Sequence, residues 1–120
     1  MRPNLVIAMN TLDASKDETG ITIDLTFSQV IGGTIVVTGT STGTAQLQVS
    51  CDQPSSLPVD STGKQIPVNW VNLGSSISIS GAGTYLIPVT QVSYKWLRLI
   101  FTHGDAAAGT VLANIFCEGQ

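Results

Sequence analysis

The sequence predicts an all-β domain, an antiparallel β-sandwich with a jelly-roll-like arrangement of strands. Thr, Val and Ile are abundant, and these β-branched residues suit a pleated sheet and lose side-chain freedom in a helix. Several segments alternate between apolar and polar residues, the period of a strand with one buried face. The 12 glycines and 5 prolines recur at short intervals, as a domain with many turns requires. Many short antiparallel strands of this kind form a sandwich, a jelly roll or a barrel.

Nine strands are predicted, and each is bounded by residues that favour turns. Turns are expected at Gly32-Gly33, at 40–43, at Gly74, at 81–83 and at 104–109. The longest loop is expected over residues 52–65. The chain is predicted to be one domain, 1–120, in which residues 1–20 form an N-terminal arm or an edge strand with its loop. The predicted strands are residues 4–9, 21–30, 34–38, 44–51, 66–73, 76–80, 84–89, 94–102 and 110–118.

The low charge content separates this chain from most soluble domains. Only 11% of the residues are charged, against roughly 25% in a typical domain, and residues 25–51 and 65–94 carry no charge at all. Interface cores are depleted of charge, so this pattern is consistent with extensive contact with partners. It is equally consistent with Thr and Ser on exposed strand faces.

The charge balance and hydropathy argue against several classes of partner. The net charge is −3, so the basic surface that neutralises nucleic-acid phosphates is not expected. No apolar run approaches the ~20 residues of a membrane span, and the apolar stretch near the N-terminus is too short for a signal peptide. We expect a protein that binds neither nucleic acid nor membrane and is made in a cytosol-like compartment. In such a compartment Cys51 and Cys117 are expected to be inward-facing, unreactive thiols.

The sequence contains no catalytic motif, so neither an enzyme nor a bound cofactor is expected. The one histidine, His103, starts a predicted turn, where a solvated or capping role is commoner than general-base catalysis. Asp13, Asp17 and Glu18 are acidic neighbours, but their spacing matches no calcium loop, and Lys16 lies among them. We expect a solvated acidic loop and no metal site.

The last two predicted strands have apolar residues on both faces. We expect them to form a hairpin with Thr102 opposite Thr110. Leu99 and Phe101 would then lie on the core face with Val111 and Ala113. The opposite apolar face must be covered, either by another part of the chain or by a partner subunit. The candidate interface is Trp96, Ile100, Leu112 and Phe116.

Two tryptophans are the strongest candidates for a carbohydrate platform. Trp70 shares strand parity with Ile66 and Val68, which favours a place in the core. Arg98 is expected to lie against Trp96 in a cation–π contact.

Residues 43–116 carry a recurring pattern of strands. A Gly-Thr-x-x-Leu-x-x-Ser strand is followed by an Asp, a Trp and a Gly-x-Tyr-Leu strand. A Tyr-x-Trp-Leu-Arg-Leu-x-Phe-Thr strand and a final Gly-Thr-x-x-Ala-x-Ile strand complete it. The matching residues are Gly43, Thr44, Leu47, Ser50, Asp52, Trp70, Gly83, Tyr85, Leu86, Tyr94, Trp96, Leu97, Arg98, Leu99, Phe101, Thr102, Gly109, Thr110, Ala113 and Ile115.

This pattern resembles the small β-sandwich virion proteins of tailed bacteriophages, especially head-decoration and related tail or fibre proteins. The chain departs from it where residues 53–64 replace a tight Asp-Gly turn before the Trp. The resemblance implies a non-enzymatic viral structural protein located in the virion and assembled in the host cytoplasm. Its implied role is a capsid decoration or stabilising protein on the outer head surface. Its implied partners are copies of itself, as a homo-oligomer such as a trimer, and the major capsid or other virion proteins.

The alternative is a carbohydrate-binding adhesion module of a phage tail, a fibre or a cell-surface protein. A similar strand with a central Arg also occurs in discoidin-type carbohydrate- or lipid-binding sandwiches.

Overall fold

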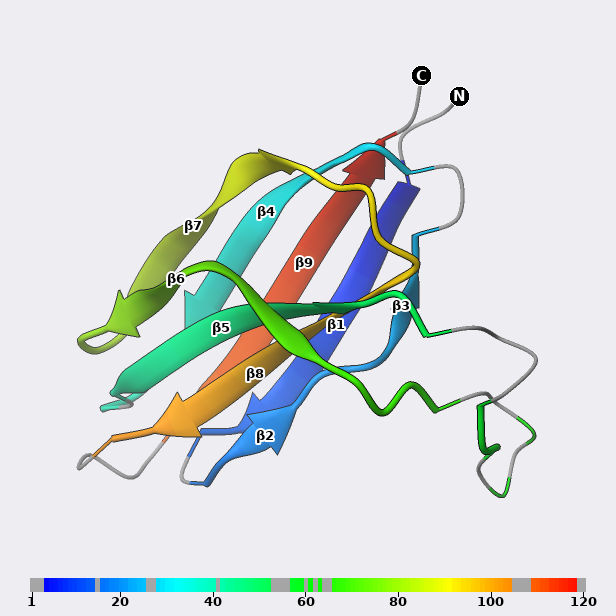
Figure 1. Ribbon diagram of the computed structural model, residues 1–120. Coiled ribbons are helices and arrows are strands. Elements are labelled where there is room, and N and C mark those ends of the chain that lie inside the picture. Colours follow the sequence, from blue (N-terminus) through cyan, green and yellow to red (C-terminus); the bar gives the residue numbers. More distant parts are fainter. Residues whose placement is uncertain are drawn as a thin grey trace.

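The computed structural model describes residues 4–14, 16–25, 28–40, 42–52, 57–59, 61, 63, 66–104 and 109–118. Within these residues the regular structure is β throughout, and no helix is long and apolar enough to cross a membrane. The strands form two antiparallel sheets packed face to face, so the predicted antiparallel β-sandwich is confirmed (Figure 1). The strands are β1 (Asn4–Asp13), β2 (Glu18–Thr19), β3 (Ile23–Asp24), β4 (Val30–Val37), β5 (Gly43–Ser50), β6 (Val71–Ile79), β7 (Gly83–Gln91), β8 (Trp96–His103) and β9 (Thr110–Glu118).

The strands pair in a nested order. Sheet A runs β1-β9-β4-β7, and sheet B runs β2-β8-β5-β6, with β3 also on β8. Early strands therefore pair with late ones: β1 with β9, β2 and β3 with β8, β4 with β7, and β5 with β6. Such pairing folds the chain as one long hairpin wound into two sheets, which is a jelly-roll-like layout. The long connection between β5 and β6 lies at the tip of that hairpin.

Alternating residues of the central strands build the core between the sheets. Leu97, Leu99 and Phe101 point inward from β8, and each has no measurable exposure. From sheet A, β9 contributes Ala113 and Ile115, which are equally buried. The alternation predicted for these strands is confirmed.

The predicted hairpin between residues 94–102 and 110–118 is wrong. β8 pairs with β5, whereas β9 pairs with β1 and β4, so Thr102 does not lie opposite Thr110. Instead, Thr102 pairs with Thr44, and Thr110 pairs with Asp13. The chain crosses from one sheet to the other between β8 and β9, because the nested order places neighbouring strands in different layers.

The predicted strand 21–30 is also wrong as a continuous element. Of the residues described in this range, only Ile23–Asp24 pair in sheet B, and the next strand begins at Val30 in sheet A. Between them the Ser28 amide donates to the Leu25 carbonyl at 2.8 Å, so the chain turns as it changes sheets. Phe27, which falls within the predicted strand 21–30, lies outside the described residues.

Two of the predicted glycine turns, Gly32-Gly33 and Gly74, lie inside strands. Gly33 is in β4, where a Cβ would clash with the Asn114 carbonyl oxygen, so glycine permits the close approach of β4 to β9. Gly74 is in β6, with a φ of 71° at a register shift opposite Gln46. The Gln46 side-chain amide donates to the carbonyls of Leu73 and Gly74, each at 3.2 Å. The predicted strands 66–73 and 76–80 are therefore a single bulged strand, which starts at Val71.

Candidate interaction surface

The four residues predicted as one interface lie on opposite sides of the molecule. Trp96 and Ile100 are on the outward face of β8 in sheet B, and Leu112 and Phe116 are on the outward face of β9 in sheet A. They cannot form a single surface, so the candidate interface must be considered sheet by sheet.

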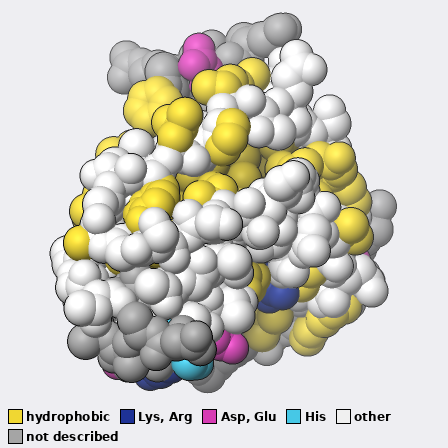
Figure 2. All heavy atoms as spheres, turned by 90° about the vertical axis from the view of Figure 1, so that its left-hand side faces the viewer, with side chains coloured by type: hydrophobic (Ala, Val, Ile, Leu, Met, Phe, Trp, Pro, Cys, Tyr) yellow, Lys and Arg dark blue, Asp and Glu magenta, His cyan; other side chains and the backbone are white. Residues whose placement is uncertain are grey.

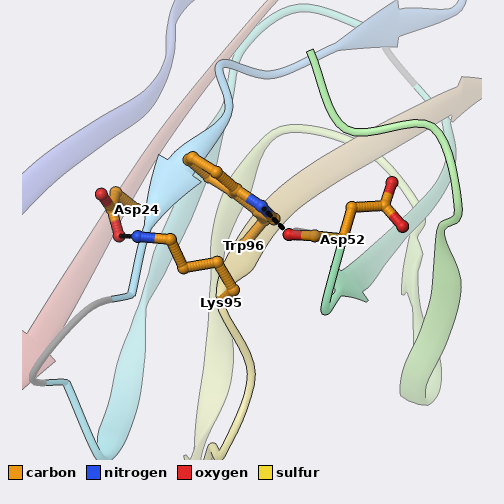
Figure 3. Close-up of polar contacts among 4 residues, drawn as sticks. All are labelled: Asp24, Asp52, Lys95 and Trp96. Atoms are coloured by element: carbon orange, nitrogen blue, oxygen red, sulfur yellow. Dashed lines mark hydrogen bonds and ion pairs between the residues drawn. The ribbon is translucent and has the colours of Figure 1, made fainter. Parts of the chain in front are cut away.

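In the sheet B half, Ile100 is half-buried and Trp96 is covered by the chain itself. Trp96 is only 7% exposed, and its indole Nε1 donates to the main-chain oxygen of Asp52 at 3.2 Å (Figure 3). On its other side, the Lys95 Nζ lies 4.7 Å from the ring centroid and 2.9 Å from Asp24 Oδ1 (Figure 3). Trp96 therefore joins β8 to β3 and to the start of the long loop, and it is not available to a partner.

The second tryptophan, Trp70, also lies on the outer face of sheet B, where it is stacked against Arg98. The Arg98 guanidinium carbon lies 4.3 Å from the Trp70 ring centroid, and the Arg98 Nε donates to Gln48 Oε1 at 2.9 Å. Partial burial of this group lowers the pKa of Arg98. The predicted core position of Trp70 and the predicted contact of Arg98 with Trp96 are therefore wrong. Residues 66–70 precede the strand, so strand parity does not apply to them.

Asp52 closes the long loop at its base. Its carboxylate accepts hydrogen bonds from the Val68 amide at 2.7 Å, from the Asn69 amide at 2.9 Å and from the Asn69 side chain at 2.8 Å. The side chain and backbone of Asn69, followed by the backbone of Val68, hold the pKa of Asp52 below its usual value. Asp52 therefore anchors the loop that ends beside Trp70.

The outward side of sheet A, in contrast, carries an apolar face. We define the apolar face by Leu5, Ile7, Leu86, Val89, Leu112 and Phe116. Val89 is 80% exposed, Leu86 is 70% exposed, and Phe116 is 44% exposed. A single exposed large apolar side chain is common on protein surfaces, but several that lie side by side indicate an interaction site.

The strand register shows that these side chains are neighbours. Phe116 is paired with Leu5 on one side and with Gly32 on the other. A Cβ placed on Gly32 would lie 3.3 Å from a Val89 methyl group. Leu5, Phe116 and Val89 therefore form one row across all four strands of sheet A, interrupted only where Gly32 has no side chain.

The missing side chain at Gly32 leaves a hollow in the apolar face. The hollow has a volume of about 260 Å³. It is lined by Val30, Ile31, Gly32, Gly33, Val89, Phe116 and Glu118. An apolar side chain of a partner could insert there and contact Val89 and Phe116.

Acidic residues flank the apolar face at its two ends. Glu118 lies beyond Phe116 on β9, and Asp13 pairs with Thr110 at the other end of the strand. The outward positions between them are apolar or neutral, such as Asn114 and Thr34. The face thus has the apolar centre and polar rim of a protein interface.

The groups considered for catalysis or metal binding have structural contacts. His103 Nδ1 lies 2.8 Å from the Gly104 carbonyl oxygen, and the His103 amide donates to Asp17 Oδ1 at 3.0 Å. The Lys16 Nζ lies 3.8 Å from Glu18 Oε1 in an ion pair of which only the lysine is exposed. Among the described residues, no three His, Cys, Asp or Glu side chains are grouped to hold a metal ion.

The two cysteines are free thiols in different environments. Cys117 points inward from β9, and burial raises the pKa of its thiol. Cys51 follows β5 and is exposed, so its predicted inward position is wrong.

We therefore expect one thiol to react in the native protein and two after unfolding. Exposure gives a thiol reagent access to Cys51, whereas Cys117 is both buried and disfavoured as a thiolate. Titration with Ellman's reagent, with and without denaturant, measures this. The Cys51→Ser variant is the control and should show no native reaction. Two reactive native thiols would contradict the burial of Cys117.

The sequence pattern located two of the six residues of the apolar face. Leu112 and Phe116 were recognised because both faces of their strand are apolar. The same signal exists in the first strand, where Leu5 and Ile7 flank the inward-facing Val6. Leu86 and Val89 are three residues apart and differ in strand parity. A register shift between them brings both to the outward face, so alternation could not have placed them together.

The fold and its surface define an antiparallel β-sandwich with an apolar face on one sheet. No family model and no curated protein sequence matches the chain. Among solved structures, the SPBc2 prophage-derived protein YomS is similar, with 12% identity, a TM-score of 0.49, and coverage of 98% of this chain and 96% of that one. A structure of the infectious bursal disease virus Gx strain has 12% identity and a TM-score of 0.44 over 97% of this chain. The chain spans 31% of that viral chain's length.

Proposed function

We propose that this chain is a non-enzymatic structural protein of a virus particle, a capsid decoration protein that docks on the outer head surface. The observation that supports this most is the apolar face, which is nearly uncharged and extends across the four strands of sheet A. A surface of this kind binds another protein surface and does not enclose a small substrate.

The geometry of the apolar face indicates what a partner surface should offer. Strands lie ≈ 4.8 Å apart and rise ≈ 3.3 Å per residue, so four strands of about eight residues cover roughly 500 Å² in projection. Docking of this area on both partners gives about 1,000 Å², the lower bound for a specific interface. The partner should offer an apolar side chain for the hollow and a basic residue opposite Glu118.

The resemblance of residues 43–116 to phage virion proteins supports a particle as the setting for this interface. The low charge content of the chain also fits a protein that functions in contact with other copies and other proteins. In this proposal the major capsid protein, or another virion protein, supplies the surface.

A carbohydrate-binding module is the second candidate. A pocket of about 250 Å³ near the start of β6 is lined by Val49, Ser50, Cys51, Asn69, Val71, Asn72 and Tyr94. Its amide side chains and its partly exposed tyrosine could bind a sugar. Against this role, the ring of Trp70 is stacked under Arg98 and Trp96 is buried, so neither indole is a free platform.

Location in a purified particle tests the proposal. Virus particles from cells that carry this gene should contain the chain in many copies, detected by mass spectrometry and by antibody labelling of the outer surface. Its absence from the particles, together with saturable binding on a glycan array, would favour the adhesion module.

A further inference from the structure

We propose that the outer face of sheet B holds a binding site for an acidic sugar, whose carboxylate pairs with Arg98. The site combines a row of hydrogen-bond donors across three strands with the pocket near the start of β6. It lies on the opposite sheet from the apolar face, so it adds a second binding function that does not depend on docking to a particle.

The row is formed by one residue from each of three neighbouring strands. Gln48 of β5 pairs with Arg98 of β8 on one side and with Asn72 of β6 on the other. The Arg98 Nε donates to Gln48 Oε1 at 2.9 Å, and Gln48 Nε2 donates to Asn72 Oδ1 at 3.0 Å. Because a guanidinium only donates, it fixes the orientation of both amides and turns the Asn72 Nδ2 group away from Gln48. The row therefore uses its acceptors internally and leaves donors for a ligand.

The Arg98 guanidinium is held in a fixed orientation. The Trp70 ring centroid lies 4.3 Å from its central carbon, and Gln48 accepts from its Nε. Within the described part of the chain, its two terminal amino groups have no hydrogen-bond or ion-pair partner. A carboxylate has two coplanar oxygens that match this pair of donors.

The charge of Arg98 is also uncompensated among the described residues. The nearby carboxylate of Asp52 is held by Asn69 and Val68, and that of Asp24 pairs with Lys95. Strands β5 and β6 contain no charged residue. Figure 2 faces the side of the molecule where β6 and β7 lie in Figure 1, and most of the described surface in this view is uncharged. A single, partly buried cation on such a surface favours a ligand with one negative charge.

The pocket beside the row supplies groups that recognise sugar hydroxyls. Its volume is about 250 Å³, and Asn72 belongs both to the row and to the pocket. Among the described residues, Asn69 Oδ1 and the Tyr94 hydroxyl have no hydrogen-bond partner, whereas Asn69 Nδ2 is held by Asp52. Sugar hydroxyls both donate and accept, so they match this acceptor, this hydroxyl and the Asn72 donor.

The two parts of the site together favour an acidic sugar over an acidic side chain of a protein. A protein carboxylate would use the guanidinium but not the pocket. One side-chain amide, that of Gln48, bridges Arg98 and Asn72 through two hydrogen bonds, so the two ends of the row are close enough for one sugar to contact both. This mode of binding needs no free indole platform.

Titration of the free protein with glucuronate, followed by nuclear magnetic resonance of the nitrogen-labelled chain, tests the site. The indole N–H of Trp70 and the side-chain amides of Asn69 and Asn72 should shift and saturate with a Kd of about 1 mM, as expected for a single sugar. Glucose has the same ring without the carboxylate and should bind about tenfold more weakly or less. Arg98→Gln should weaken the binding of glucuronate by about tenfold or more.

Lys95→Gln is the matched control, because it removes the same charge from a position outside the row. It should leave the Kd for glucuronate within about twofold, since charges outside the site are screened by salt. Asn72→Asp is a second variant at an exposed residue, so the test does not depend on the folding of Arg98→Gln. It keeps the acceptor for Gln48 but adds a like charge beside the ligand, and it should also weaken the binding of glucuronate.

Two results would overturn the proposal. One is the absence of saturable shifts with glucuronate, galacturonate and N-acetylneuraminate up to ~50 mM. The other is equal binding of acetyl-glutamate amide, which would assign the site to an acidic side chain of a protein. These measurements need no particle, so their failure is distinct from a failure of the proposed docking.

Discussion

Replacing Phe101 by Ala is expected to lower the free energy of unfolding by about 3–5 kcal/mol. Phe101 has no measurable exposure and is the largest fully buried side chain among the residues that the structure describes. It lies on the central part of sheet B, between Ala45 of β5 and Glu18 of β2. Removal of the ring leaves a cavity that flanking strands cannot fill, because both are fixed by backbone hydrogen bonds to β8.

Thermal unfolding followed by circular dichroism measures this effect. For a domain of this size the loss corresponds to a drop of roughly 10–20 °C in Tm, a large part of a total stability of ~5–15 kcal/mol. Phe116→Ala is the matched control, because it deletes the same ring from a position that is 44% exposed. The control should cost about 1 kcal/mol or less. Equal losses for the two variants would contradict the assignment of Phe116 to the outer surface.

The sequence was sufficient to predict the class of fold because alternation reports burial directly. β5, β8 and β9 were located to within about two residues, since each has apolar residues at every second position and a turn at each end. The predicted strand ends were wrong where a glycine has a structural role other than forming a turn. Gly33 allows β4 to approach β9, and Gly74 forms a bulge, yet both resemble turns in the sequence.

The partners of the strands could not be predicted from the same signal. Alternation states which residues of a strand share a face, but it does not state which strand lies beside it. Adjacent strands usually pair, so residues 94–102 and 110–118 suggested a hairpin. The nested order of the fold instead separates them, and their outward faces have different environments. That of β8 is covered in part by Trp70 and by the start of the long loop, whereas that of β9 carries Leu112 and Phe116.

Replacing Phe116 by Asp is expected to abolish docking on the particle and to leave the fold intact. The inward side of β9 keeps Ala113 and Ile115, so the core is unchanged. In a docked complex the new carboxylate would lie beside the hollow, where an apolar partner side chain excludes water. An unpaired charge in a desolvated interface costs several kcal/mol, which corresponds to at least a hundredfold loss of affinity.

Thr44→Asp provides the control, because Thr44 is an exposed strand residue on the outer face of sheet B. Co-sedimentation of purified protein with particles that lack it measures docking, and circular dichroism measures stability. The expected result is lost docking with nearly unchanged Tm for Phe116→Asp, and normal docking for Thr44→Asp. A collapse of Tm for Phe116→Asp would mean that this side of β9 belongs to the core. Normal docking by both variants would show that the particle is bound through another surface.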